Sequence, residues 1–84
     1  MYNNRRRDLE ASGLHPGGIF QHYVGRYYQL VAIFKDVRTK KTMVTLIDIK
    51  DFDYGLSIPL IEFVELVKTD SGTVPRFLYI GSVI

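Results

Sequence analysis

Short runs of alternating apolar and polar residues, rich in β-branched and aromatic side chains, dominate the chain after residue 18. A period of two is typical of β-strands, and no stretch after residue 18 shows the period of an amphipathic helix. Five or six short strands are therefore predicted, over residues 19–24, 26–35, 42–49, 56–58, 64–69 and 73–80. The connection at 36–41 is too short for a crossover, so the strands on either side of it should pair antiparallel.

The segment 26–35 is apolar on both faces toward its end. Regular alternation places Tyr28, Leu30, Ala32 and Phe34 on one face, and Tyr27, Gln29, Val31 and Ile33 on the other. We expect a strand that curls, so that each half buries a different side.

Proline and glycine mark the other boundaries. Pro59 lacks an N–H and should end the strand 56–58, with a single 3₁₀ turn over 59–63. A tight turn is predicted at 70–72. Strands this short with hairpin spacing predict an all-β fold, either a small SH3-like barrel or a bent antiparallel sheet roll, with an OB-type barrel as the alternative.

Residues 1–17 differ from the rest of the chain and are predicted to form an N-terminal arm, partly flexible or with a short helix over 6–11. The sequence His15-Pro16-Gly17-Gly18 would end any such helix and begin the domain, which spans 18–84.

Composition limits the classes of protein that this chain can be. In 84 residues, 46% are hydrophobic and 24% charged, which is typical of a globular domain. Cysteine is absent, so neither a disulfide framework nor a thiolate metal site is possible. No apolar run reaches the roughly 20 residues of a membrane span, and the N-terminus has no apolar signal region. We therefore expect a cytoplasmic protein.

Charge is unevenly placed. The formal net charge is +2, and the run Arg5, Arg6 and Arg7 holds much of the excess. The remainder of the chain is nearly neutral, whereas a nucleic-acid domain usually has a denser basic face. A nucleic-acid-binding barrel, with this run as an arm and exposed tyrosines as stacking platforms, is thus the second hypothesis and not the first.

Several short motifs resemble one family. They are His22-Tyr23-x-Gly25-x-x-Tyr28, Tyr54-Gly55-Leu56, Pro59-Leu60-x-x-Phe63-x-Glu65 and Val74-Pro75-Arg76-Phe77. Together they resemble the small bacterial family of domain of unknown function 1653, over most of the chain from Gly18 to Gly81. The resemblance implies a compact β fold and no particular chemistry.

The chain departs from the family pattern in two places. Asp36-Val37-Arg38-Thr39 stands where the family usually has His-Ser-Glu-Thr, and Ser57-Ile58-Pro59-Leu60 replaces Trp-Val-Arg-Pro-Leu. A family site built on those residues would be lost or altered in this chain.

Four residues are candidates for a binding site: His22, Tyr23, Tyr54 and Arg76. His22 titrates near neutral pH, but as strand neighbours His22 and Tyr23 should point to opposite faces. Arg76 could recognise a carboxylate or phosphate, or pair with Glu62, Glu65 or Asp53 to close one end of the fold. A small anion or ligand binder around these residues is the third hypothesis.

Catalytic and metal centres are not predicted. The serines lack the context of an activated nucleophile, so we expect no enzyme. Asp48, Asp51 and Asp53 resemble part of a calcium loop but lack its length and its closing glutamate, so they more simply keep a turn solvated. No cofactor is expected.

The eleven aromatic residues exceed what so small an interior can hold. Some of Tyr27, Tyr28, Tyr54, Tyr79, Phe52 and Phe77 must be exposed, and exposed aromatic residues favour protein contacts. The leading hypothesis is therefore a non-enzymatic binding module that contacts a protein partner or its own copy through an aromatic face. A homodimer is favoured, with Val83 and Ile84 near the contact, over an arm that folds back through Leu9 and Leu14.

Overall fold

The computed structural model describes residues 13–82, and its elements are almost entirely β-strands. In chain order they are β1 (Gly18–His22), β2 (Tyr27–Lys35), β3 (Thr42–Asp48), β4 (Gly55–Pro59), α2 (Leu60–Phe63), β5 (Leu66–Thr69), β6 (Gly72–Pro75) and β7 (Phe77–Ser82). The prediction of an all-β fold is confirmed. Within the described part of the chain, no helix has the length and apolar character needed to cross a membrane.

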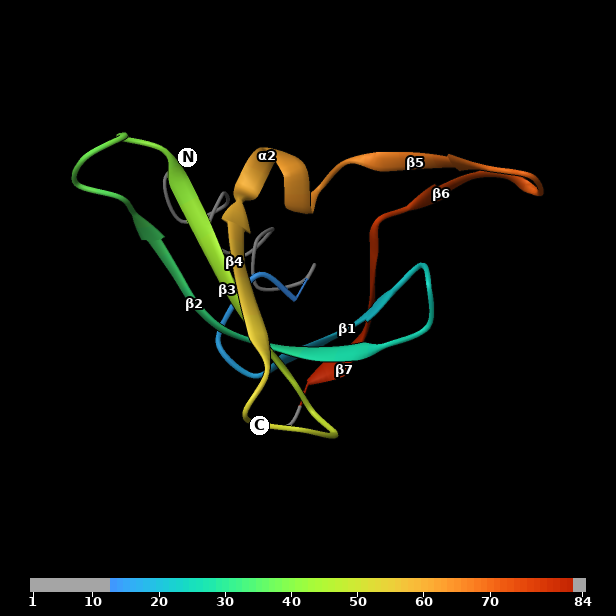
Figure 1. The fold of residues 1–84 in the computed structure, drawn as a ribbon, viewed down its shortest axis with the longest axis horizontal. Helices are drawn as coiled ribbons and strands as arrows, with labels where there is room; N and C mark the ends of the chain where they lie inside the picture. Colours follow the sequence, from blue (N-terminus) through green and yellow to red (C-terminus); the bar gives the residue numbers. More distant parts are fainter. Residues whose placement is uncertain (1–12, 83–84) are drawn as a thin grey trace, which may run out of the picture.

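The strands form two antiparallel sheets. The larger has the order β4-β3-β2-β1-β7, and the smaller is the hairpin β5-β6, which extends away from the larger sheet in Figure 1. The larger sheet is strongly bent, because β2 starts along the direction of β1 and ends along that of β3 (Figure 1). Of the predicted architectures, the bent antiparallel sheet therefore describes the molecule, with β4 and β7 as its two edges.

A β-bulge in β2 produces this bend. Leu30 pairs with Leu46 and Ala32 pairs with Thr45, so Val31 is an extra residue without a partner. Leu30 and Ile33 consequently both face the core. The predicted curl is present, but the predicted alternation past Leu30 is wrong, because the bulge shifts the remainder of the strand by one position.

The core lies on the inner face of the bent sheet, beneath α2. Its buried members are Phe20, Leu30, Val44, Leu46, Phe63 and Phe77. The ring of Phe63 lies 4.9 Å from that of Phe20 and also 4.9 Å from that of Phe77, so this helix residue joins β1 to β7. A single helical turn is thus present close to the predicted position, and it fixes one side of the core. It is α-helical and not the predicted 3₁₀ turn, because the N–H of Val64 donates to the carbonyl of Leu60 (3.1 Å).

The predicted strand 73–80 is interrupted at Arg76. The N–H of Arg76 donates to the carbonyl of Glu65 (2.9 Å), whereas its carbonyl accepts the N–H of Tyr23 (3.0 Å). At this residue the chain therefore leaves the hairpin β5-β6 and joins the larger sheet beside β1. The described residues consequently hold seven strands and not five or six.

Part of the predicted arm belongs to the folded domain. Leu14 packs against the core, and the N–H of Gly17 donates to the carbonyl of Leu30 (2.9 Å). The predicted helix 6–11, the run Arg5–Arg7 and Leu9 lie outside the described residues, as do Val83 and Ile84.

Candidate functional site

His22 and Tyr23 lie side by side at the end of β1. Their ring centroids are 4.6 Å apart, so the prediction that they point to opposite faces is wrong. The reason is that β1 ends at His22 and a turn begins, closed by hydrogen bonds from His22 N–H to the Arg26 carbonyl (2.8 Å) and from Gly25 N–H to the His22 carbonyl (2.7 Å). Strand alternation does not continue through a turn.

The surroundings of His22 favour its neutral form. Its Nδ1 accepts the N–H of Val24 (3.2 Å), and its ring packs edge-on against Phe77 at 4.9 Å. Partial burial, followed by the positive charge of nearby Arg76, lowers the pKa of His22 below the usual histidine value. Both effects penalise the charged imidazolium.

Arg76 makes one of the three ion pairs that were predicted for it. Its Nη2 donates to Glu65 Oε1 at 3.1 Å, and the two residues also share a backbone hydrogen bond. This contact ties the chain at the start of β7 to the residue before β5. It corresponds to the ion pair predicted for Arg76, and not to recognition of a bound carboxylate or phosphate. The Nε of Arg76 is buried and has no hydrogen-bond partner among the described residues.

Tyr54 lies in the β3–β4 turn and is exposed. Its carbonyl accepts the N–H of Asp48 (2.9 Å) and its N–H donates to the Asp51 carbonyl (3.0 Å). The structure groups His22, Tyr23 and Arg76 at the junction of β1 and β7, whereas Tyr54 belongs to a separate polar network.

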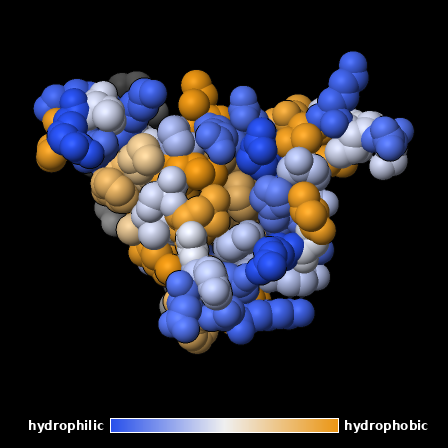
Figure 2. Space-filling view, in the orientation of Figure 1, coloured by the Kyte–Doolittle hydropathy of each residue, from blue (hydrophilic) through white to orange (hydrophobic). Residues whose placement is uncertain are grey.

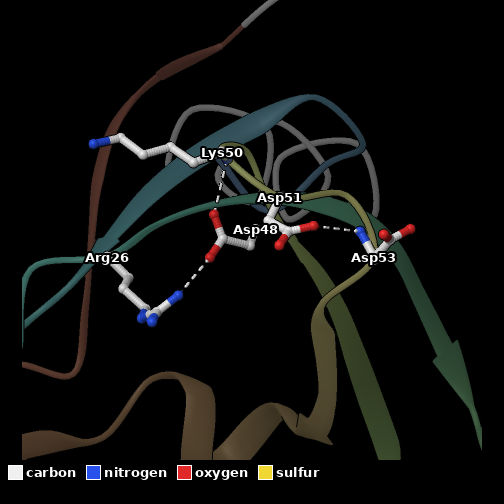
Figure 3. A network of polar contacts seen from close by, with 5 residues as sticks. All are labelled: Arg26, Asp48, Lys50, Asp51 and Asp53. Carbon is white, nitrogen blue, oxygen red and sulfur yellow. Dashed lines mark hydrogen bonds and ion pairs between the residues drawn. The ribbon is translucent and has the colours of Figure 1, made fainter.

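Asp48 is the centre of that network (Figure 3). Its carboxylate is only 5% exposed, and both oxygens are engaged. Oδ1 accepts the N–H of Lys50 (2.8 Å), and Oδ2 accepts Nη1 of Arg26 (2.9 Å). The Lys50 hydrogen bond, together with the Arg26 contact, lowers the pKa of Asp48 despite the opposing effect of burial. The carboxylate is therefore ionised at neutral pH.

A polar hollow of about 460 Å³ opens beside this ion pair. Its lining residues are Arg26, Tyr28, Asp48, Asp51, Tyr54 and Gly55, and we call it the Arg26 pocket. Three of these residues, Tyr28, Tyr54 and Gly55, are among those that carry the family resemblance. Gly55 is required by the backbone, because a Cβ there would lie 2.5 Å from the carbonyl oxygen of Leu46.

The three aspartates of this turn do not build a metal site. Both oxygens of Asp48 are occupied by protein donors, and Oδ1 of Asp51 accepts the N–H of Asp53 (3.2 Å). Across residues 13–82, no group of acidic and histidine side chains is arranged to hold a metal ion.

The outer face of the larger sheet is uncharged. Strand register and the two bulges place fourteen side chains there: Ile19, Gln21, Tyr27, Gln29, Val31, Ala32, Phe34, Met43, Thr45, Ile47, Ser57, Pro59, Leu78 and Ile80. Four of them are polar, and none carries a charge. Charged side chains instead concentrate at the β2–β3 loop, the β3–β4 turn and the tip of β5-β6, which appear as the three blue extremities of Figure 2.

Aromatic residues contribute little to this face. Tyr27 and Phe34 belong to it, whereas Tyr28, Tyr79 and Phe77 pack in or against the core. Phe52 and Tyr54 are exposed in the β3–β4 turn, as the surplus of aromatic residues predicted. The outer face is thus mainly aliphatic.

A further polar cluster, which the sequence did not predict, joins the segment 13–17 to β7. The hydroxyl of Ser82 lies 2.8 Å from the Tyr79 hydroxyl and 3.3 Å from Nε2 of His15. These side chains lie at or near the surface and tie the start of the domain to its last strand.

Comparison with known proteins supports the family resemblance. No curated protein matches the chain. The crystal structure of a DUF1653 protein from Bordetella bronchiseptica is similar to this chain, with a TM-score of 0.72 and 26% sequence identity, over 83% of this chain and 91% of that one. The model of the family described as "Protein of unknown function (DUF1653)" matches residues 18–79. Because this match covers most of the chain, the protein belongs to the DUF1653 family.

Proposed function

We propose that this protein is a small binding module, that its contact surface is the outer face of the larger sheet, and that it binds a second copy of itself. One observation carries the proposal: the fourteen side chains on that face include no charge. The face differs from the aromatic surface that the sequence predicted, because its apolar residues are mainly aliphatic.

An uncovered sheet face normally carries polar side chains, since only the other face packs on the core. Here Leu78 and Ile80 remain 52% and 49% exposed, and Val31 and Phe34 are also exposed. Fully burying an aliphatic or aromatic side chain contributes about 1.5–3 kcal/mol relative to leaving it in water. A partner that covers these side chains therefore gains substantial free energy.

The strand β7 favours a second copy as the partner. It is an edge strand and contains neither a charged residue nor a proline, the two features that usually keep sheet edges apart. Two copies related by a two-fold axis can therefore pack their outer faces against each other at β7, so that the same residues of each copy meet. Leu78 and Ile80 would then meet their counterparts at the centre of the contact.

The test is the mass of the full chain in solution at micromolar concentration, measured by light scattering coupled to gel filtration. We expect a dimer for the natural chain and a monomer for Leu78→Lys and for Ile80→Lys, because each places a charge in the contact. Ile61→Lys is the matched control, since Ile61 is 78% exposed but belongs to α2, on the inner side of the sheet.

A natural chain that is monomeric at this concentration overturns self-association. A dimer that persists in both β7 variants, with thermal unfolding confirming that they are folded, shows instead that the contact lies elsewhere.

A further inference from the structure

The Arg26 pocket combines side chains from two segments that are distant in the sequence, residues 26–28 and 48–55. Arg26 comes from the turn before β2, Tyr28 from the start of β2, and Asp51 and Tyr54 from the β3–β4 turn. The two turns are held by backbone hydrogen bonds, including those from His22 to Arg26 and from Asp48 to Tyr54. The lining is thus fixed by the fold and does not depend on one mobile side chain.

Arg26 presents a prepared anion-binding group in this pocket. Its side chain is 71% exposed, yet the buried carboxylate of Asp48 holds Nη1 at 2.9 Å. One N–H of the guanidinium is engaged by the described residues, and its other donors remain open. An arginine that is already positioned loses less conformational freedom when it binds a carboxylate.

Asp51 supplies the opposite charge. Its Oδ1 accepts the N–H of Asp53, and Oδ2 makes no hydrogen bond with any other described residue. Figure 3 shows Arg26 approaching Asp48 from one side, while Asp51 lies on the other. With one positive and two negative side chains, the lining has a formal net charge of −1, which repels an anion that brings no positive group.

We propose that the Arg26 pocket binds a small zwitterion that carries a carboxylate and an ammonium group, as amino acids do. The carboxylate pairs with the open donors of Arg26, the ammonium pairs with Asp51, and the tyrosines Tyr28 and Tyr54 contact the carbon chain between them. Asp48 is a positioning residue, because both of its oxygens are already occupied by protein donors. This proposal is independent of the self-association proposed above, since it rests on other residues.

The experiment is an NMR titration of the full, ¹⁵N-labelled chain that follows the amide signals of Tyr54 and Gly55. The probes are glycine, β-alanine and γ-aminobutyrate, which differ in the separation of their two charges, together with propionate and propylamine as single-charge controls. We expect the zwitterion of matching length to bind at least about tenfold more tightly than either control, because it makes two charged contacts and not one.

Three variants separate the contacts. Asp51→Asn should remove the preference for the zwitterion over propionate. Arg26→Lys keeps a positive charge beside Asp48, so the protein stays folded, but lysine lacks the planar fork of arginine. This variant should bind the zwitterion and propionate about tenfold more weakly and should bind propylamine as the natural chain does. Asp53→Asn is the control, since Asp53 belongs to the same turn but does not line the pocket.

Two results would overturn the proposal. One is the absence of signal shifts with every zwitterion at millimolar concentration. The other is zwitterion binding that is equal to propionate binding, or that is unaffected by Asp51→Asn.

Discussion

At the scale of single residues, His22 couples folding to pH. Its pKa is lowered in the folded protein, so between that value and the unfolded value of about 6.5 the unfolded chain binds more protons. The contribution of neutral His22 to the free energy of unfolding is fully present above about pH 6.5. It declines as the pH falls from there toward the lowered pKa of the folded protein. The Val24 N–H and the Phe77 ring keep the neutral imidazole in place.

His22→Gln should therefore flatten the pH dependence of stability in this window. We expect the free energy of unfolding in urea to fall less between about pH 7.5 and pH 5.5 for this variant than for the natural chain. His15→Gln, which leaves the Val24 and Phe77 contacts of His22 in place, is the comparison variant for replacing a histidine by glutamine. Equal slopes for His22→Gln and the natural chain would contradict the role of His22.

The sequence predicts individual residues of the candidate sites better than it predicts the side chains with which they form ion pairs. Arg76 was expected to pair with one of three acids, and it pairs with Glu65. The Arg26–Asp48 pair was not predicted, because 22 residues separate its members and no local pattern relates them. Only the pairing of Tyr28 with Asp48 across β2 and β3 brings that carboxylate beside the turn that holds Arg26.

At the scale of elements, α2 shows how little regular structure is needed to complete the core. The helix has four residues, and Phe63 is its one buried member. So short a helix is unstable alone, and it forms here because Pro59 begins it and Phe63 anchors it between Phe20 and Phe77.

Phe63→Ala should therefore destabilise the protein by about 3–5 kcal/mol, since it removes a buried aromatic ring and leaves a cavity. Ile61→Ala, in the same helix but exposed, should change the stability by less than about 0.5 kcal/mol. Urea unfolding followed by circular dichroism measures both. Similar losses for the two variants would mean that α2 does not anchor the core through Phe63.

The positions of the strands could be predicted because alternation is a local property. Which side chains of β2 lie on each face of the sheet could not be predicted. Residues 30–34 are all apolar, so the sequence contains no polar residue that would reveal the extra position at Val31. The break at Arg76 does have a local signal, because Pro75 lacks an N–H and ends β6 as Pro59 ends β4. The apolar residues on both sides of Pro75 nevertheless read as one strand. Which partner each half pairs with is decided by contacts across the whole fold.

At the scale of the whole molecule, the described residues cover the inner side of the bent sheet with the short helix α2 and leave its outer face open. A domain of this size hides only about 60% of the surface that its unfolded chain exposes, so its apolar outer face is a considerable share of what remains. If a second copy covers that face, folding and association are coupled, and the apparent stability depends on protein concentration.

The midpoint of urea unfolding should then rise with protein concentration, because each tenfold increase adds up to about 1.4 kcal per mole of dimer to the apparent free energy of unfolding. The natural chain and Ile61→Lys should both show this dependence. Leu78→Lys should show none, because a charge on the outer face at β7 prevents the two faces from packing together. A midpoint that is constant for the natural chain from low micromolar to high micromolar concentration would mean that the domain folds as a monomer, and would overturn self-association.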